Sequence, residues 1–85
     1  MKLTRHDIII IRALFKLNKK QFAFLCDFSP EYISKIENGT RPISEKLEKK
    51  VIERFKLNDD ILQRIKVLAQ LAKQLEQEGR LKKLD

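Results

Sequence analysis

Residues 18–42 hold several side chains whose types and spacing could carry chemistry, among them Glu31, Tyr32 and Lys35. Lys35 can donate to guanine O6 and N7, and Glu31 can accept from the amino group of cytosine. Tyr32 can donate to a phosphate or pack on a thymine methyl group, whereas Pro30 offers only apolar contact. No acid pair, nucleophile–base set or Gly-rich phosphate loop occurs in a supporting context, so we expect a binding protein and no enzymatic activity.

Two short helices joined by a tight turn must position these side chains. Each helix is expected to bury one apolar stripe, made of Phe22, Ala23 and Cys26 in the first helix and of Ile33 and Ile36 in the second. Between the stripes, Asp27 tolerates the left-handed backbone of a sharp turn and Ser29 is a preferred N-cap. Pro30 then suits the first helical position. Residues 18–38 therefore predict a helix-turn-helix, a unit that lays its second helix in the DNA major groove.

The same segment resembles the Cro and phage-repressor family of helix-turn-helix regulators, also called the xenobiotic-response-element type. The residues that carry the resemblance are Phe22-Ala23, Ser29 and the run from Tyr32 to Pro42, within a match of roughly residues 8–57. Lys19 stands where the family usually has a Gln, Asp27 replaces the usual turn Gly, and Phe22 replaces the usual Leu. The resemblance implies an all-α, five-helix, lambda-repressor-like DNA-binding domain.

The resemblance also implies which residues contact DNA. It places a recognition helix at residues 30–38, with base edges within reach of Pro30, Glu31, Tyr32 and Lys35. The full expected DNA-binding set is Lys19, Lys20, Ser29, Pro30, Glu31, Tyr32, Lys35, Asn38, Thr40 and Arg41. For two residues of this set, another role stays open. Glu31 can serve as an acid in the first turn of a helix, and Lys20 can be a solvated surface charge.

Arg12 and Glu37 match positions at which the family often has a partly buried ion pair between the first and third helices. Desolvation offsets much of the Coulomb attraction in such a pair. We therefore expect the pair to orient the recognition helix, with no catalytic part for either residue.

Capping residues predict where five helices begin. The caps are Thr4, Asn18, Ser29, Ser44 and Asn58. The first three helices are expected to span residues 4–16, 19–26 and 30–38, with Gly39 ending the third by taking a positive φ. Residues 1–57 are assigned to the helix-turn-helix domain and residues 58–85 to a C-terminal helix.

Apolar residues recur along the C-terminal helix at heptad-like steps. They are Ile61, Ile65, Leu68, Ala72 and Leu75. Such a stripe indicates packing on the same chain, dimerisation, or both. Surplus apolar residues elsewhere favour a covered surface, so we expect this helix, from the same or a partner chain, to lie over some of Ile9, Ile10, Leu14, Phe24 and Leu25.

Composition sets further limits. The 85 residues allow one domain with a small core. The formal charge of +7 falls mostly on the helix-turn-helix and the helix after it, with +4 in residues 1–43, +2 in residues 44–58 and +1 in residues 59–85. Cys26 is the single cysteine, so a reducing cytoplasm is the expected compartment. No apolar run approaches the length of a membrane span, and His6 has no second ligand at metal spacing. We expect no cofactor, metal or membrane partner.

The sequence thus predicts a DNA-binding transcriptional regulator, specifically a repressor from a phage, plasmid or other mobile element. A homodimer on an inverted repeat in double-stranded DNA would supply the selectivity that one short helix lacks. A regulatory protein or peptide partner is compatible with this reading. Two alternatives stay open. One is a helix-turn-helix module that binds another protein, such as an antirepressor or antitoxin-like partner, and the other is a nonspecific nucleic-acid-coating protein.

Overall fold

Five α-helices and their connections make up the computed structural model, which describes residues 2–80. Their bounds are α1 Arg5–Leu14, α2 Lys19–Leu25, α3 Pro30–Glu37, α4 Glu45–Arg54 and α5 Asp59–Gln77. The all-α, five-helix fold expected from the sequence is confirmed. Among the described residues, no helix is both long and apolar enough to cross a membrane.

Each helix begins at the predicted capping residue. In every case the side chain of the N-cap accepts a hydrogen bond from the backbone N–H three residues later, at Thr4, Asn18, Ser29, Ser44 and Asn58. Thr4 and Asn18 form complete capping boxes, because Asp7 and Gln21 accept from the N-cap N–H in return.

The first three helices end one or two residues earlier than predicted. Lys16 takes φ 54°, Asp27 φ 59° and Gly39 φ 86°, and such left-handed residues end a helix by turning the chain away. In the corner after α1, the Leu17 N–H bonds to the Arg12 carbonyl at 3.0 Å. In the corner after α3, the Thr40 N–H bonds to the Lys35 carbonyl at 2.9 Å. The left-handed backbone was predicted at Asp27 and Gly39, but not at Lys16 or Lys56.

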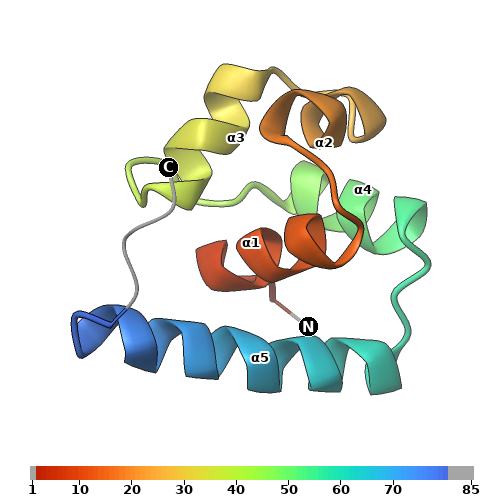
Figure 1. Ribbon diagram of the computed structural model, residues 1–85. Helices are drawn as coiled ribbons and strands as arrows, with labels where there is room; N and C mark the ends of the chain where they lie inside the picture. The colour runs from red at the N-terminus through yellow and green to blue at the C-terminus, as the bar shows by residue number, and fades with distance from the viewer. Residues whose placement is uncertain (1, 81–85) are drawn as a thin grey trace.

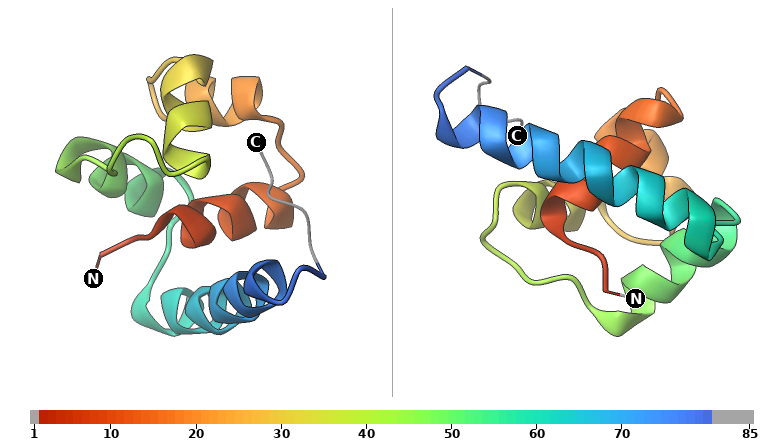
Figure 2. Two further views of the ribbon diagram at one scale, coloured as in Figure 1. Left: turned by 90° about the vertical axis from the view of Figure 1, so that its left-hand side faces the viewer. Right: turned by 90° about the horizontal axis from the view of Figure 1, so that it is seen from below.

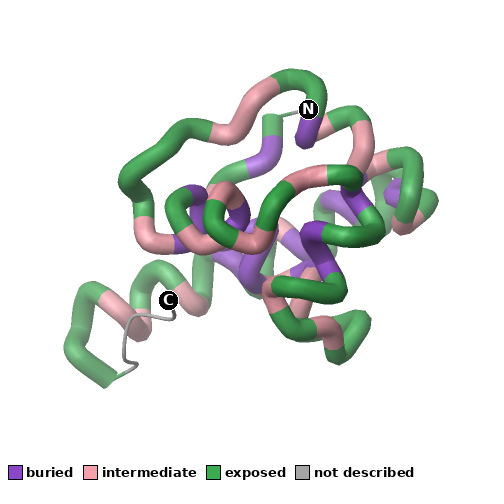
Figure 3. Tube along the Cα trace, turned by 90° about the horizontal axis from the view of Figure 1, so that it is seen from above, coloured by how far each residue is buried: buried purple, intermediate pink, exposed green. Residues whose placement is uncertain are grey.

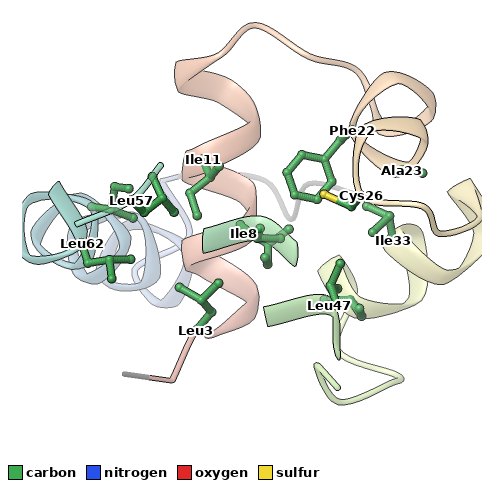
Figure 4. Close-up of a cluster of buried hydrophobic side chains, with 13 residues drawn as sticks. Leu3, Ile8, Ile11, Phe22, Ala23, Cys26, Ile33, Leu47, Leu57 and Leu62 are labelled. Carbon is green, nitrogen blue, oxygen red and sulfur yellow. The ribbon is translucent and has the colours of Figure 1, made fainter. Parts of the chain in front are cut away.

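Helix α1 lies at the centre of the molecule (Figure 1). Helices α2 and α3 lie on one side of it and α5 on the other, and the second set of views shows α5 crossing beneath α1 (Figure 2). Ile8 and Ile11 of α1 are fully buried, with Phe22 and Ile33 on one side and Leu62 on the other (Figure 4). Burial of each such side chain stabilises the fold by about 1.5–3 kcal/mol.

Helix α5 packs against its own chain. Leu62 and Ile65 belong to the same buried cluster as residues of α1–α4, and Ala69 is buried as well. Of the residues expected in the α5 stripe, Ile65 is buried and Ala72 and Leu75 are half-buried, while Ile61 and Leu68 are exposed. The last turns of α5 are mostly exposed, as Figure 3 shows. The packed stripe of α5 therefore shares Ile65, Ala72 and Leu75 with the predicted stripe, but contains Leu62 and Ala69 in place of Ile61 and Leu68.

The surplus apolar residues of α1 and α2 are covered only in part. Ile9 is buried and Ile10 is half-buried, but Leu14 and Leu25 are exposed, and Phe24 is 81% exposed. Because α2 and α5 lie on opposite sides of α1, α5 of the same chain does not cover Phe24 or Leu25. Covering of Phe24 or Leu25 by the C-terminal helix of a partner chain stays a prediction.

Cys26 is fully buried in the core, and burial raises the pKa of its thiol to about 11. We expect thiol reagents to label Cys26 only as fast as the protein unfolds, because the reactive thiolate is both shielded and disfavoured. Labelling with and without denaturant at neutral pH measures this. Rapid labelling of the native protein would contradict it.

The raised pKa of Cys26 also predicts how stability depends on pH. An ordinary thiol ionises near pH 9.0, so the thiol of the unfolded chain loses its proton first as pH rises. The free energy of unfolding should therefore fall as pH rises from about 9 towards 11.

Candidate nucleic-acid interface

The turn between α2 and α3 sets which side of α3 faces outward. Asp27 carries the left-handed backbone, and the Phe28 N–H bonds back to the Ala23 carbonyl at 2.9 Å. Ser29 then caps α3 and Pro30 occupies its first turn, as predicted. Ile33 and Ile36 are fully buried beneath α3. Of the other side chains of α3, Glu37 is fully buried as well, whereas Glu31 and Lys35 are exposed.

An open hollow on this outward surface brings several predicted residues together. It is lined by Phe28, Ser29, Glu31, Tyr32, Lys35, Arg41 and Ser44. Two cationic side chains and one carboxylate thus share a surface with two aromatic rings. Helix α5 lies on the opposite side of α1, so its described part leaves this surface uncovered (Figure 1). Of the other predicted residues, Pro30 and Asn38 are half-buried and Thr40 is exposed.

Tyr32 is engaged within the chain. Its hydroxyl oxygen accepts from the Ser44 N–H at 3.3 Å and its O–H donates to the Pro42 carbonyl at 3.5 Å. Its ring stacks on Phe28, with centroids 5.1 Å apart, and the Arg41 guanidinium carbon lies 5.8 Å from its centroid. Tyr32 therefore joins α3 to the α3–α4 loop and supports Arg41. Phe28 and Ser44 take part in this arrangement, although the sequence did not predict that either residue belongs to this surface.

The loop after α3 is held by short-range hydrogen bonds. The Thr40 N–H donates to the Lys35 carbonyl at 2.9 Å and to the Asn38 side-chain oxygen at 3.0 Å. The Thr40 hydroxyl also donates to that Asn38 oxygen, at 2.7 Å. Asn38 and Thr40 thus fix the loop conformation, and the exposed Arg41 side chain extends from it.

Lys19 and Lys20 lie at the start of α2, where Lys19 is half-buried and Lys20 is exposed. The structure does not place Lys20 in the hollow beside α3. Lys20 instead borders a separate apolar depression lined by Leu17, Gln21, Phe24 and Leu25. Phosphate contacts by Lys19 and Lys20 stay a prediction.

A bidentate ion pair joins α1 to α3. Arg12 Nε and Nη2 donate to the two carboxylate oxygens of Glu37, each at 2.8 Å, and Arg12 Nη1 donates to the Leu17 carbonyl at 3.2 Å. The Glu37 side chain is fully buried and that of Arg12 is 18% exposed. The predicted pairing of Arg12 with Glu37 is confirmed, and it fixes the end of α3 relative to α1.

Asp27 extends the interface towards α4. Its carboxylate lies 3.2 Å from Lys50 Nζ and 3.7 Å from Arg54 Nη2. All three side chains are at least 30% exposed, so these contacts contribute little to stability. They do offset part of the positive charge on α4. The cationic side chains that line the hollow beside α3 are Lys35 and Arg41.

Residues 8–62, well over half of the chain, match the family model described as Helix-turn-helix. The chain belongs to the Cro and phage-repressor type of this helix-turn-helix family. No curated protein and no solved structure gives a significant match. The helix-turn-helix family is one of DNA-binding transcriptional regulators, and the exposed outward side of α3 agrees with that general role.

Proposed function

We propose that the protein is a sequence-specific transcriptional repressor, of the kind that phages, plasmids and other mobile elements encode, and that it acts in the cytoplasm. The observation that carries this proposal is the surface on which Glu31, Lys35 and Arg41 are exposed together while Ile33 and Ile36 are buried beneath. Lys35 would read guanine and Glu31 would accept from cytosine in the major groove. Arg41, Lys19 and Lys20 would contact phosphates and set the register on the duplex.

A homodimer on an inverted repeat would give this short reader its selectivity, since each good base contact discriminates by only about 1–3 kcal/mol. Support for a dimer comes from α5, on which Ile61, Leu68 and Leu71 are exposed although they are apolar. These residues lie beside the face that packs on α1, so a second copy could cover them without displacing Leu62 or Ile65.

Selection from a random duplex library, followed by footprinting, tests the proposal. A symmetric site with half-sites about one helical turn apart is expected for a dimer with two recognition helices. Light scattering coupled to size exclusion would measure the mass of the protein alone and on the selected duplex. Enrichment of no sequence would favour a nonspecific coating protein, and an asymmetric site would contradict the symmetric dimer.

DNA affinity should depend steeply on salt. If about three to five phosphates are neutralised per monomer, the slope of log affinity against log salt should be about −3 to −4.5 per monomer and twice that for a dimer. Anisotropy of a labelled duplex over a series of salt concentrations measures the slope. Tight binding with a slope near zero would contradict a phosphate-based interface.

A protein-binding module is the second candidate, and a specific observation favours it. Phe24 is 81% exposed, and with Leu17 and Leu25 it borders an apolar depression on α2. An antirepressor or antitoxin-like protein could bind such a surface. This alternative would be favoured over the repressor by two results together. The wild-type protein would show no preference among DNA duplexes, and Phe24→Ser would abolish binding to a partner protein.

A further inference from the structure

Arg5 connects three helices that are distant in sequence. It begins α1, and its two terminal nitrogens donate in different directions. Arg5 Nη1 donates to the backbone carbonyl of Glu37 at 2.9 Å, and Arg5 Nη2 donates to Glu76 Oε1 at 2.8 Å. The Arg5 and Glu76 side chains are 25% and 15% exposed. One partly buried guanidinium thus joins the last residue of α3 to the last turn of α5.

At α3, Arg5 acts on the helix end from which the α3–α4 loop departs. The Glu37 carbonyl is one of the last four of the helix, which lack partners inside it, and a cation is favourable at this end. Arg12 holds the Glu37 side chain while Arg5 holds its backbone. Arg5 also lies against Gly39, because a Cβ there would be 3.7 Å from Arg5 Cδ and Nε.

At α5, Glu76 fixes the direction of the Arg5 side chain. The hydrogen bond from Arg5 lowers the pKa of the Glu76 carboxyl below its ordinary value of 4.5, so the carboxylate is ionised at neutral pH. His6 lies on the other side of this carboxylate, with its Nε2 3.4 Å from Glu76 Oε2. Elsewhere along the helix, Lys66 pairs with the buried Asp7 of α1. The contact between Glu76 and Arg5 is therefore charge-assisted and part of a docked helix.

We propose that Arg5 is a positioning residue that transmits the docking of α5 to the DNA-reading end of α3. While Glu76 holds the guanidinium on the Glu37 carbonyl, the corner at residues 38–41 keeps the conformation from which Lys35 and Arg41 face outward. Release of the last turn of α5 frees Arg5 from that carbonyl and loosens the corner. The DNA consequence rests on the proposed function, whereas the positioning of the corner does not.

Charge-matched variants separate positioning from simple electrostatics. Glu76→Ala and Asp59→Ala each remove one negative charge from α5, and Asp59 is exposed at the other end of that helix. We expect Glu76→Ala to bind the selected duplex at least about fivefold more weakly than Asp59→Ala, once both affinities are corrected for the folded fraction. Loss of a negative charge alone would strengthen DNA binding, because it makes the protein more positive.

Four further variants complete the comparison. Glu76→Gln has the charge of Glu76→Ala but keeps an oxygen that can accept from Arg5, so it should recover part of the affinity. Arg5→Ala should lose more affinity than Lys73→Ala, which removes an exposed cation of α5. The double variant Arg5→Ala/Glu76→Ala should bind no more weakly than Arg5→Ala alone, because the two residues act through one contact. A fall in unfolding free energy with unchanged affinity of the folded protein would overturn the proposal.

A measurement without DNA keeps the two proposals distinguishable. Backbone amide shifts of Gly39, Thr40 and Arg41 should move in Glu76→Ala and stay unchanged in Asp59→Ala. If the wild-type protein prefers no duplex sequence, the repressor assignment fails and these shifts still decide whether Arg5 positions the corner. Unchanged shifts in Glu76→Ala would overturn the positioning proposal whatever the DNA measurements show.

Discussion

Glu37→Ala is expected to lower the free energy of unfolding by about 3 kcal/mol. The substitution removes a fully buried carboxylate and leaves Arg12, whose side chain is only 18% exposed, without its bidentate partner. Most of the cost comes from that uncompensated charge, because the intact pair gains little over its own desolvation. Urea unfolding followed by circular dichroism measures the change.

A double variant distinguishes the unpaired charge from the loss of packing. Arg12→Met/Glu37→Leu removes both charges and keeps similar volume, so it should be considerably more stable than Glu37→Ala. The double variant should still bind DNA less well than wild type, since the ion pair also orients α3. Equal instability of the two variants would contradict the explanation from an unpaired Arg12.

Lys35→Ala is expected to reduce discrimination between the selected duplex and a scrambled one by about 1–3 kcal/mol, which is roughly 5- to 150-fold. Lys35 is exposed at the hollow beside α3 and can donate to the acceptor edge of guanine. Competition binding with both duplexes at fixed salt measures the ratio.

Lys73→Ala is the matched control for this prediction, because it removes the same charge from an exposed position of α5 on the far side of the molecule. It should weaken binding to the two duplexes slightly and equally. Should Lys35→Ala also weaken both duplexes alike, Lys35 would be a phosphate contact, and the sequence preference would have to come from other residues.

The elements that the sequence predicted correctly depend on local chemistry. Thr4, Asn18, Ser29, Ser44 and Asn58 each accept from a backbone N–H three residues away, so the capping residue and its partner are read from one short segment. The contact between Arg12 and Glu37 is not local, and it was expected only because the family resemblance supplied it.

The features that the sequence did not predict depend on tertiary contacts. The bond from Arg5 to the Glu37 carbonyl ends on a backbone atom 32 positions away, so it leaves no pattern of residue types. The Tyr32 hydroxyl likewise bonds to backbone atoms, the Pro42 carbonyl and the Ser44 N–H. In α5, Ile61 and Leu68 have the same spacing as Leu62 and Ala69, and only the position of α1 decides which of the two stripes is buried.

The placement of Tyr32 has a practical consequence. It is the only tyrosine of the chain, and the chain has no tryptophan. All tyrosine emission of the unmodified protein therefore originates from one ring, which stacks on Phe28 beneath the Arg41 guanidinium. An incoming duplex that draws Arg41 away from that ring would change its intensity, so the native chain carries its own optical reporter of occupancy at α3.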